Sequence, residues 1–94
     1  MAAKLSDSEI DARLEDLVDW TRQDGEIRKL FKLASFPGAI AFVTQVGFLA
    51  EAANHHPDID IRWRKVSLAL TTHDAGGLTE KDFELAAQID EILG

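Results

Sequence analysis

The first hydrophobic pattern in the chain has helical spacing. Ser6 with Glu9 three residues later is a capping-box pattern, which marks a helix start. The apolar positions that follow recur at helical intervals and are Ile10, Leu14, Leu17 and Val18. This spacing predicts a first helix that ends near Asp19.

A strand pattern replaces the helical one in the next segment. Residues 20–23 form a short strand candidate, and Asp24-Gly25 is a strong signal for a two-residue hairpin turn. Residues 26–36 alternate, with Ile27, Phe31 and Leu33 on one face. Lys29 also falls on this apolar face, so we expect the second strand to have an exposed end.

A second helix is predicted between Pro37-Gly38, which breaks the strand, and about Asn54. Its apolar stripe, spaced for packing on a sheet, is Phe42, Val46, Leu49 and Ala53. Pro57 forbids helical continuation and pushes His56 towards an extended backbone. The segment from Asn54 to Pro57 is therefore expected where the helix gives way to a loop.

The last third of the chain predicts two strands and a helix. Ile61 and Trp63 share one strand parity, while Val66, Leu68 and Leu70 share the other, so a tight turn or a bulge is expected near Arg64-Lys65. Ala75-Gly76-Gly77 reads as a loop. Thr79 then caps a third helix whose apolar positions are Leu85, Ala86, Ile89, Ile92 and Leu93.

The predicted order of elements is αββαββα, within a single domain covering residues 1–94. Two hairpins interleaved with helices predict an α+β fold, in which a four-stranded antiparallel sheet carries three helices on one face. The sequence shows no internal repeat and no linker.

Composition narrows the function classes. The net charge of −7 argues against direct nucleic-acid binding, which needs a basic face, but permits a protein partner. The absence of cysteine excludes disulfides, thiolate catalysis and cysteine-ligated zinc. We find no apolar run near the length of about 18 residues that spans a membrane, and no signal-peptide pattern at the N-terminus. A cytoplasmic protein is therefore expected.

Candidate chemistry centres on the adjacent residues His55 and His56, followed by Pro57. Histidine can give or take a proton near neutral pH, so this pair suits proton transfer. A third histidine, His73, follows an apolar strand. The alternative is structural: a polar loop with one capping imidazole, and a strand-end histidine bonded to the backbone.

Three further residues have both a functional and a structural interpretation. Glu51 stands four residues before His55, so it can orient that imidazole if the helix persists, or it can be a solvated helix-end residue. Asp82 stands three residues after Thr79, where it completes a capping box, although it can also face a site. Trp63 fits the sheet core, or a wall for a planar ring.

Other kinds of site are disfavoured. Adjacent histidines at a helix end rarely converge on one metal ion, and no helix carries histidines four residues apart. We find no serine–histidine nucleophile pattern and no glycine-rich phosphate loop. The expected site therefore contains no metal.

Together these residues resemble the active-site pattern of the pterin-4a-carbinolamine dehydratases. That pattern is a glutamate, three residues, His-His-Pro, five or six residues, an aromatic, nine residues, a histidine, eight or more residues, and an aspartate. The matching positions are Glu51, His55-His56-Pro57, Trp63, His73 and Asp82. The resemblance runs from about Trp20 to the C-terminus, with one departure at Ile59, where many members carry an aromatic residue.

The resemblance implies the same α+β fold and a reaction that needs neither a redox cofactor nor a metal. A 4a-hydroxytetrahydropterin loses water to give the quinonoid dihydropterin, which recycles the cofactor of aromatic amino acid hydroxylases. In this interpretation His55 and His73 transfer protons and His56 binds and polarises the substrate. Glu51 orients His55, Asp82 orients a histidine or holds the polar edge of the pterin, and Trp63 walls the ring.

The resemblance leaves other functions open. Animal relatives also act as dimerisation cofactors of a homeodomain transcription factor, so a protein-binding module is one alternative. A dehydratase acting on another pterin, such as one in molybdenum cofactor metabolism, is a further alternative. Family members are commonly dimers or tetramers, so a homodimer or homotetramer is expected, and an aromatic amino acid hydroxylase is a candidate partner in the same pathway.

Overall fold

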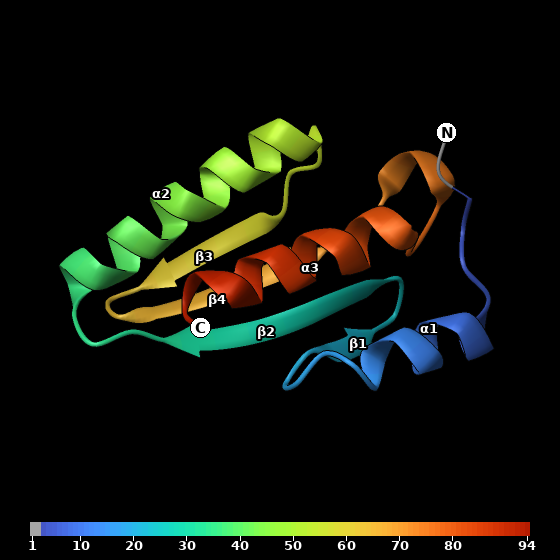
Figure 1. Ribbon diagram of the computed structural model, residues 1–94, viewed down its shortest axis with the longest axis horizontal. Helices are drawn as coiled ribbons and strands as arrows, with labels where there is room; N and C mark the ends of the chain where they lie inside the picture. Colours follow the sequence, from blue (N-terminus) through green and yellow to red (C-terminus); the bar gives the residue numbers. More distant parts are fainter. Residues whose placement is uncertain (1–2) are drawn as a thin grey trace.

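The structure, a computed structural model, describes residues 3–94. Its elements are α1 (Asp7–Leu14), β1 (Thr21–Gln23), β2 (Glu26–Lys32), α2 (Phe36–Ala53), β3 (Asp58–Arg62), β4 (Lys65–Leu70), the 3₁₀ turn η1 (His73–Ala75) and α3 (Glu80–Ile92). Apart from the 3₁₀ turn, the order is αββαββα, as the sequence predicts. Figure 1 shows these elements along the chain.

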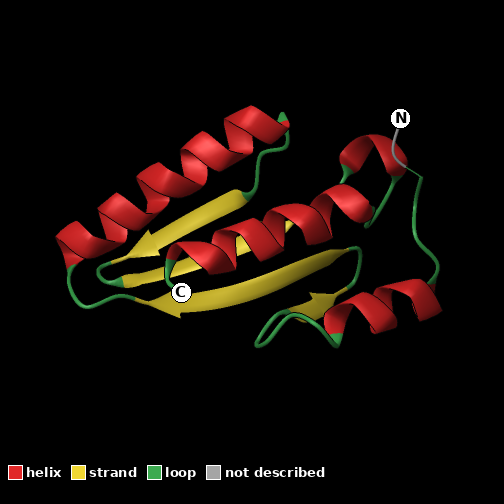
Figure 2. Ribbon diagram, in the orientation of Figure 1, coloured by secondary structure: helices red, strands yellow, loops and turns green. Residues whose placement is uncertain are grey.

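The four strands form one antiparallel sheet in the order β1-β2-β4-β3. The central pair, β2 and β4, runs in register from Ile27 opposite Leu70 to Lys32 opposite Lys65. Helices α2 and α3 lie side by side over the sheet, and α1 lies at the β1 edge (Figure 2). The predicted α+β fold class is therefore confirmed.

The capping box at Ser6 forms, but α1 is shorter than predicted. The Ser6 hydroxyl accepts from the Glu9 N–H, and the Ser6 N–H donates to the Glu9 carboxylate, which holds the pKa of Glu9 below its usual range. Helix α1 ends at Leu14 rather than near Asp19, because tight turns follow and Asp19 takes a left-handed φ of 67°. Val18 is consequently exposed, whereas Trp20 is buried.

The boundary between β2 and α2 also differs from the prediction. Strand β2 ends at Lys32, and α2 begins at Phe36 with Ser35 as its N-cap. The Ser35 hydroxyl accepts from the Gly38 N–H, and Pro37 occupies the first helical turn. Proline suits this position because the first turn has no use for its missing N–H, so Pro37 starts the helix instead of only ending the strand.

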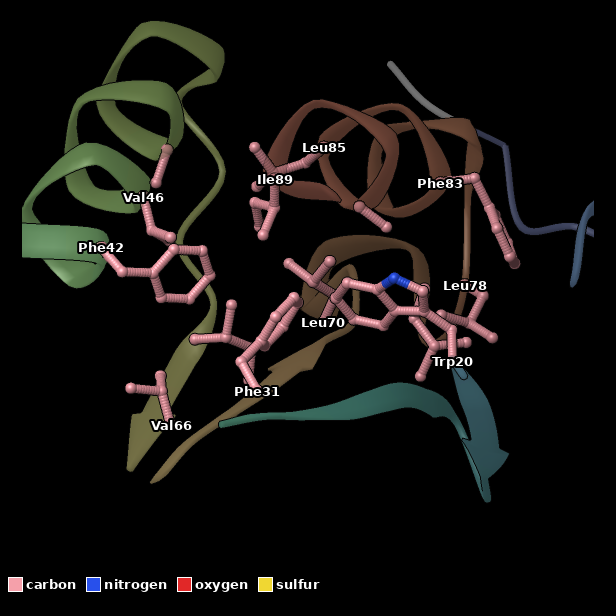
Figure 3. Packing of buried hydrophobic residues seen from close by; sticks show 14 of the residues in the cluster. Trp20, Phe31, Phe42, Val46, Val66, Leu70, Leu78, Phe83, Leu85 and Ile89 are labelled. Atoms are coloured by element: carbon pink, nitrogen blue, oxygen red, sulfur yellow. The ribbon is translucent and has the colours of Figure 1, made fainter. Parts of the chain in front are cut away.

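The core lies between the sheet and the two long helices. In Figure 3, Phe42 and Val46 from α2 face Ile89 of α3, and Phe31 rises from the sheet beneath them. The Phe31 ring packs against Phe42 at 4.8 Å between centroids and against the edge of Trp20 at 6.1 Å. Each of these aromatic side chains buries roughly 150–250 Å² of surface, so they are large contributors to the core.

The sequence predicts an exposed strand end at Lys29, and the structure contradicts this prediction. Its side chain is only 16% exposed, and its ammonium group donates to Asp90 on α3 at 2.9 Å. Asp90 also accepts from the indole N–H of Trp20. A partly buried lysine on the apolar face is tolerated here because a carboxylate from the covering helix pairs with it.

The parity change between β3 and β4 comes from a two-residue turn and not from a bulge. Arg62 pairs with Lys65, which leaves Trp63 and Arg64 in the turn. Trp63 has a left-handed φ of 62° and is 83% exposed. The interpretation of Trp63 as sheet core is therefore wrong, because the turn directs its side chain into solvent.

Helix α2 has more apolar surface than this core uses. It buries Ala39, Phe42, Val46 and Ala50 against the sheet and α3, while Phe36, Ile40 and Phe48 remain largely exposed. Its 18 residues contain one charge, Glu51, so by length and composition it is apolar enough to cross a membrane. The prediction that no such run exists is therefore wrong, although one face of α2 packs into the core of this fold.

Two leucines on α3 test the assignment of the core. Leu85 is 1% exposed, and replacing it with alanine should destabilise the protein by roughly 2–5 kcal/mol, because a cavity opens beneath α3. Leu93, at the end of the helix, is 54% exposed, and the same replacement there should change stability by less than about 0.5 kcal/mol. Urea unfolding of both variants measures the difference, and equal costs would contradict this packing.

Candidate active site

The antiparallel pairing of β3 and β4 brings the predicted site residues to one end of the sheet. Asp58, the first residue of β3, is opposite Ala69 near the end of β4. The segment that precedes β3 and the segment that follows β4 therefore lie at the same end. We call this the histidine end, because it carries His55 and His56 on the first segment and His73 on the second.

The end of α2 fixes the backbone of His55. Asn54 adopts a left-handed conformation with φ of 50°, and the His55 N–H then donates to the Ala50 carbonyl at 3.0 Å. This closure is typical of helix C-termini and turns the chain away from the helix axis. Asparagine tolerates the left-handed region well, so the sequence signal for the helix end at Asn54 is confirmed.

His55 is buried and paired with Asp82. Its Nε2 atom lies 2.5 Å from Asp82 Oδ1, and the two side chains are 10% and 0% exposed. The partner, Asp82 of α3, thus lies 27 residues further along the chain. A carboxylate accepts hydrogen bonds, so an ionised Asp82 holds neutral His55 as the tautomer with its proton on Nε2.

The other ring nitrogen of His55, Nδ1, is free of hydrogen bonds to the described residues. Nδ1 has no hydrogen bond in the described part of the chain, and no buried side-chain nitrogen or oxygen there lacks a partner. Nδ1 must therefore reach the protein surface. With Nε2 bonded to Asp82, this nitrogen has a free lone pair and can exchange a proton with a bound molecule.

Glu51 pairs with His56 and not with His55. Its Oε1 atom lies 2.9 Å from His56 Nε2, and both side chains are open to solvent, at 82% and 62% exposure. The expected pairing of Glu51 with His55 required the helix to continue as far as His55. The left-handed Asn54 ends that geometry and places His56 next to Glu51 instead.

His73 lies on the other side of the histidine end. It begins η1, is exposed, and lines a shallow hollow of about 440 Å³ next to the β1–β2 turn. Its neighbour Thr72 donates to Asp82, so the chain position of His73 is tied to the carboxylate that His55 also contacts. The walls of this hollow do not include His55 or His56.

Trp63 does not join this cluster within the same chain. It follows the last residue of β3, whereas the histidines precede the first, so the length of the strand separates them. It therefore cannot wall a ring that is bound next to His55 of its own chain. Ile59, at the beginning of β3 and 41% exposed, is the large exposed apolar side chain nearest in sequence to the two histidines and Pro57.

Sequence reasoning missed Thr72, whose hydroxyl donates to Asp82 Oδ2 at 2.9 Å. The only signal was its place immediately before His73, which predicts nothing about its partner. The capping role of Asp82 was visible: its Oδ2 accepts from the Thr79 N–H at 2.9 Å and completes the box at the start of α3. Within residues 3–94, no three metal-ligating side chains of the histidine, cysteine, aspartate and glutamate types gather into one site.

The fold and this site define a class: an α+β domain in which a helix-capping carboxylate holds one of three histidines at a sheet end. The family model described as pterin 4 alpha carbinolamine dehydratase matches residues 3–92. The chain belongs to this family, as the resemblance in the sequence indicates.

Bacterial relatives are similar over almost their whole length. One, from Roseiflexus sp. (strain RS-1), named "Putative pterin-4-alpha-carbinolamine dehydratase", is 74% identical and is matched over 99% of this chain and 100% of its own. A relative of the same name from Chloroflexus aurantiacus (strain ATCC 29366 / DSM 635 / J-10-fl) is 66% identical, with 97% and 98% covered.

Solved structures share the fold. The crystal structure of a transcriptional coactivator/pterin dehydratase from Brucella melitensis superposes with a TM-score of 0.93 at 32% identity, covering 97% of this chain and 99% of that one. A pterin dehydratase-like protein, identified as a RuBisCO assembly factor in the alpha-carboxysome, gives a TM-score of 0.65 at 24% identity, with 80% and 87% covered. The second likeness shows the fold alone.

The two carboxylate–histidine pairs should differ sharply in their contribution to stability. Asp82→Ala leaves His55, Thr72 and the Thr79 N–H without a shared acceptor in a buried place, and should cost roughly 3–5 kcal/mol. Glu51→Ala removes an exposed partner of His56 and should leave stability nearly unchanged. Chemical denaturation measures the free energy of unfolding of both variants. An Asp82→Ala protein as stable as wild type would contradict the buried network.

Proposed function

We propose that this protein dehydrates a 4a-hydroxytetrahydropterin to the quinonoid dihydropterin. The observation that carries the proposal is the buried His55–Asp82 pair, which leaves the Nδ1 atom of His55 unbonded at the end of the sheet that also holds His56 and His73. Membership of the family supports the same reaction.

The reaction needs one proton to be delivered and one to be removed. The 4a carbon–oxygen bond breaks, and the oxygen must be protonated as it departs because hydroxide is a poor leaving group. A ring nitrogen lone pair drives out the water, and the N–H proton of the ring is then lost. Imidazoles perform both transfers near neutral pH, and each typically contributes roughly 10²–10⁴-fold.

In our assignment, His55 and His73 carry the two protons, and His56 binds and polarises the substrate. Asp82 orients His55, and Glu51 orients His56 rather than its neighbour. Pro57 holds the loop in the extended form that starts β3. The ring of the substrate would lie over the histidine end, where Ile59 supplies exposed apolar surface.

The wider role that we propose is recycling of the pterin cofactor of an aromatic amino acid hydroxylase in the cytoplasm. The site pattern is also compatible with another pterin, such as one in molybdenum cofactor metabolism. A protein-binding role is the second candidate, since the Brucella melitensis relative is named both a coactivator and a dehydratase. The exposed face of α2 supports this candidate because it offers apolar surface outside the core.

A dehydratase assay with a synthetic 4a-hydroxytetrahydropterin tests the reaction. The wild-type protein should accelerate the loss of water, followed by the absorbance of the quinonoid product. His55→Gln and His73→Gln should each lower kcat by roughly 10²–10⁴-fold, because each removes a proton carrier. His56→Gln should mainly raise KM, because its proposed role is binding.

Glu84→Gln, an exposed change on α3, is the control and should retain wild-type kinetics. No acceleration by the wild-type protein over the spontaneous reaction would exclude this activity and favour the binding role. Full activity of His73→Gln would overturn the assignment of the second proton carrier.

The α2 surface also supports self-association as a homodimer or homotetramer. A second copy suits this helix because the helix is free of charge from Phe36 to Ala50, so an identical face can pack on it without burying an ion. We expect a dimer or tetramer in sedimentation. Phe48→Glu should shift it to monomer, because Phe48 is 74% exposed on that helix.

Val18→Glu is the matched control, since Val18 is 73% exposed but lies outside α2. It should retain the wild-type assembly. A monomeric wild-type protein, or an assembly that tolerates Phe48→Glu, would rule out α2 as the contact surface.

A further inference from the structure

The direction of every hydrogen bond around Asp82 can be worked out by counting protons. The Lys81 N–H donates to Thr79 Oγ1 at 3.2 Å, and the two threonine hydroxyls, Thr72 and Thr79, lie 2.9 Å apart. An ionised Asp82 offers only acceptors, so Thr72 uses its single proton on Oδ2. The bond between the two threonines then needs the Thr79 hydroxyl as its donor. Thr79 gives its single hydroxyl proton to Thr72.

The result is a chain of donors that all point towards one carboxylate. It begins at the N-terminus of α3, passes through the two threonine hydroxyls and ends on Asp82 Oδ2, where the Thr79 N–H also donates. Among residues 3–94, only His55 bonds to Oδ1. Asp82 and Thr79 are fully buried and Thr72 is 8% exposed, so water does not substitute for a missing member.

We propose that Thr72 is a positioning residue that acts through Asp82 to fix which nitrogen of His55 carries the proton. With Oδ2 held by two donors, the carboxylate cannot rotate away from the imidazole. The proton of neutral His55 is then held on Nε2, and Nδ1 keeps its lone pair. This inference rests on the proposed function only for its kinetic consequence.

The backbone around Thr72 is held independently of its hydroxyl. The Thr72 N–H donates to the Gly77 carbonyl at 3.1 Å, and the Gly77 N–H donates back to the Thr72 carbonyl. A side-chain replacement at this position should therefore leave the loop that carries His73 in place. The hydroxyl can be removed with little change of shape by Thr72→Val, and retained by Thr72→Ser.

Nitrogen-15 NMR of the imidazole rings tests the proposal without any activity measurement. At a pH where the ring is neutral, wild type and Thr72→Ser should show His55 with Nδ1 bare and a slowly exchanging proton on Nε2. In Thr72→Val the carboxylate loses a donor, so the Nε2 proton should exchange faster and both tautomers should be populated. An unchanged His55 spectrum in a folded Thr72→Val protein would overturn the proposal.

A second variant keeps the test decisive if Thr72→Val does not fold. In Asp82→Asn, Thr72 and the Thr79 N–H require an acceptor at Oδ2, so the amide oxygen is held there and its NH₂ group faces His55. Nε2 must then accept, and the His55 proton should move to Nδ1. Retention of the wild-type tautomer in Asp82→Asn would contradict the directional chain.

Measurements of kcat and KM distinguish a failure of the role of Thr72 from a failure of the proposed function. Thr72→Val should lower kcat by about tenfold with KM unchanged, because one hydrogen bond to a charged group is lost, and Thr72→Ser should restore kcat. If wild type has no dehydratase activity, the proposed function fails while the NMR result still decides the role of Thr72. If wild type is active and Thr72→Val is equally active, the role in positioning fails alone.

Discussion

The buried carboxylate of Asp82 is the constraint on which the rest of the site depends. It joins three segments of the chain: the start of α3, the segment after β4 through Thr72, and, from 27 residues earlier in the sequence, the segment after α2 through His55. A carboxylate without exposure to solvent is costly unless its oxygens are fully bonded. Here each oxygen has a donor, so the group that caps a helix also locks together the end of the sheet.

The same contacts give the two adjacent histidines different chemistry. His55 is buried against Asp82, which favours one fixed tautomer of its ring. His56 and its partner Glu51 are open to solvent, which screens their interaction and leaves both side chains free to change conformation. Neighbouring residues of the same type thus differ because the helix ends between Glu51 and His55.

The surface of α2 carries apolar side chains outside the core. The sheet and α3 cover only part of an almost uncharged helix, and the uncovered part carries large apolar side chains. Exposed apolar side chains gathered on one helix are typical of surfaces that associate with another protein. The site at one end of α2 and the apolar surface along it are separate features, so the proposed pterin site and a protein contact on α2 do not compete for the same surface.

Local spacing and caps within a few residues predicted the α+β class, the order of elements, both capping boxes and the helix end at Asn54. The grouping of the three histidines with Asp82 came from the resemblance of the sequence to the family. Which side chains pair with each other depends on the tertiary fold. One left-handed residue assigned Glu51 to His56, a two-residue turn placed Trp63 in solvent, and α3 supplied partners for both Lys29 and His55. Such pairings join residues far apart in the chain, and no local periodicity encodes which of them meet.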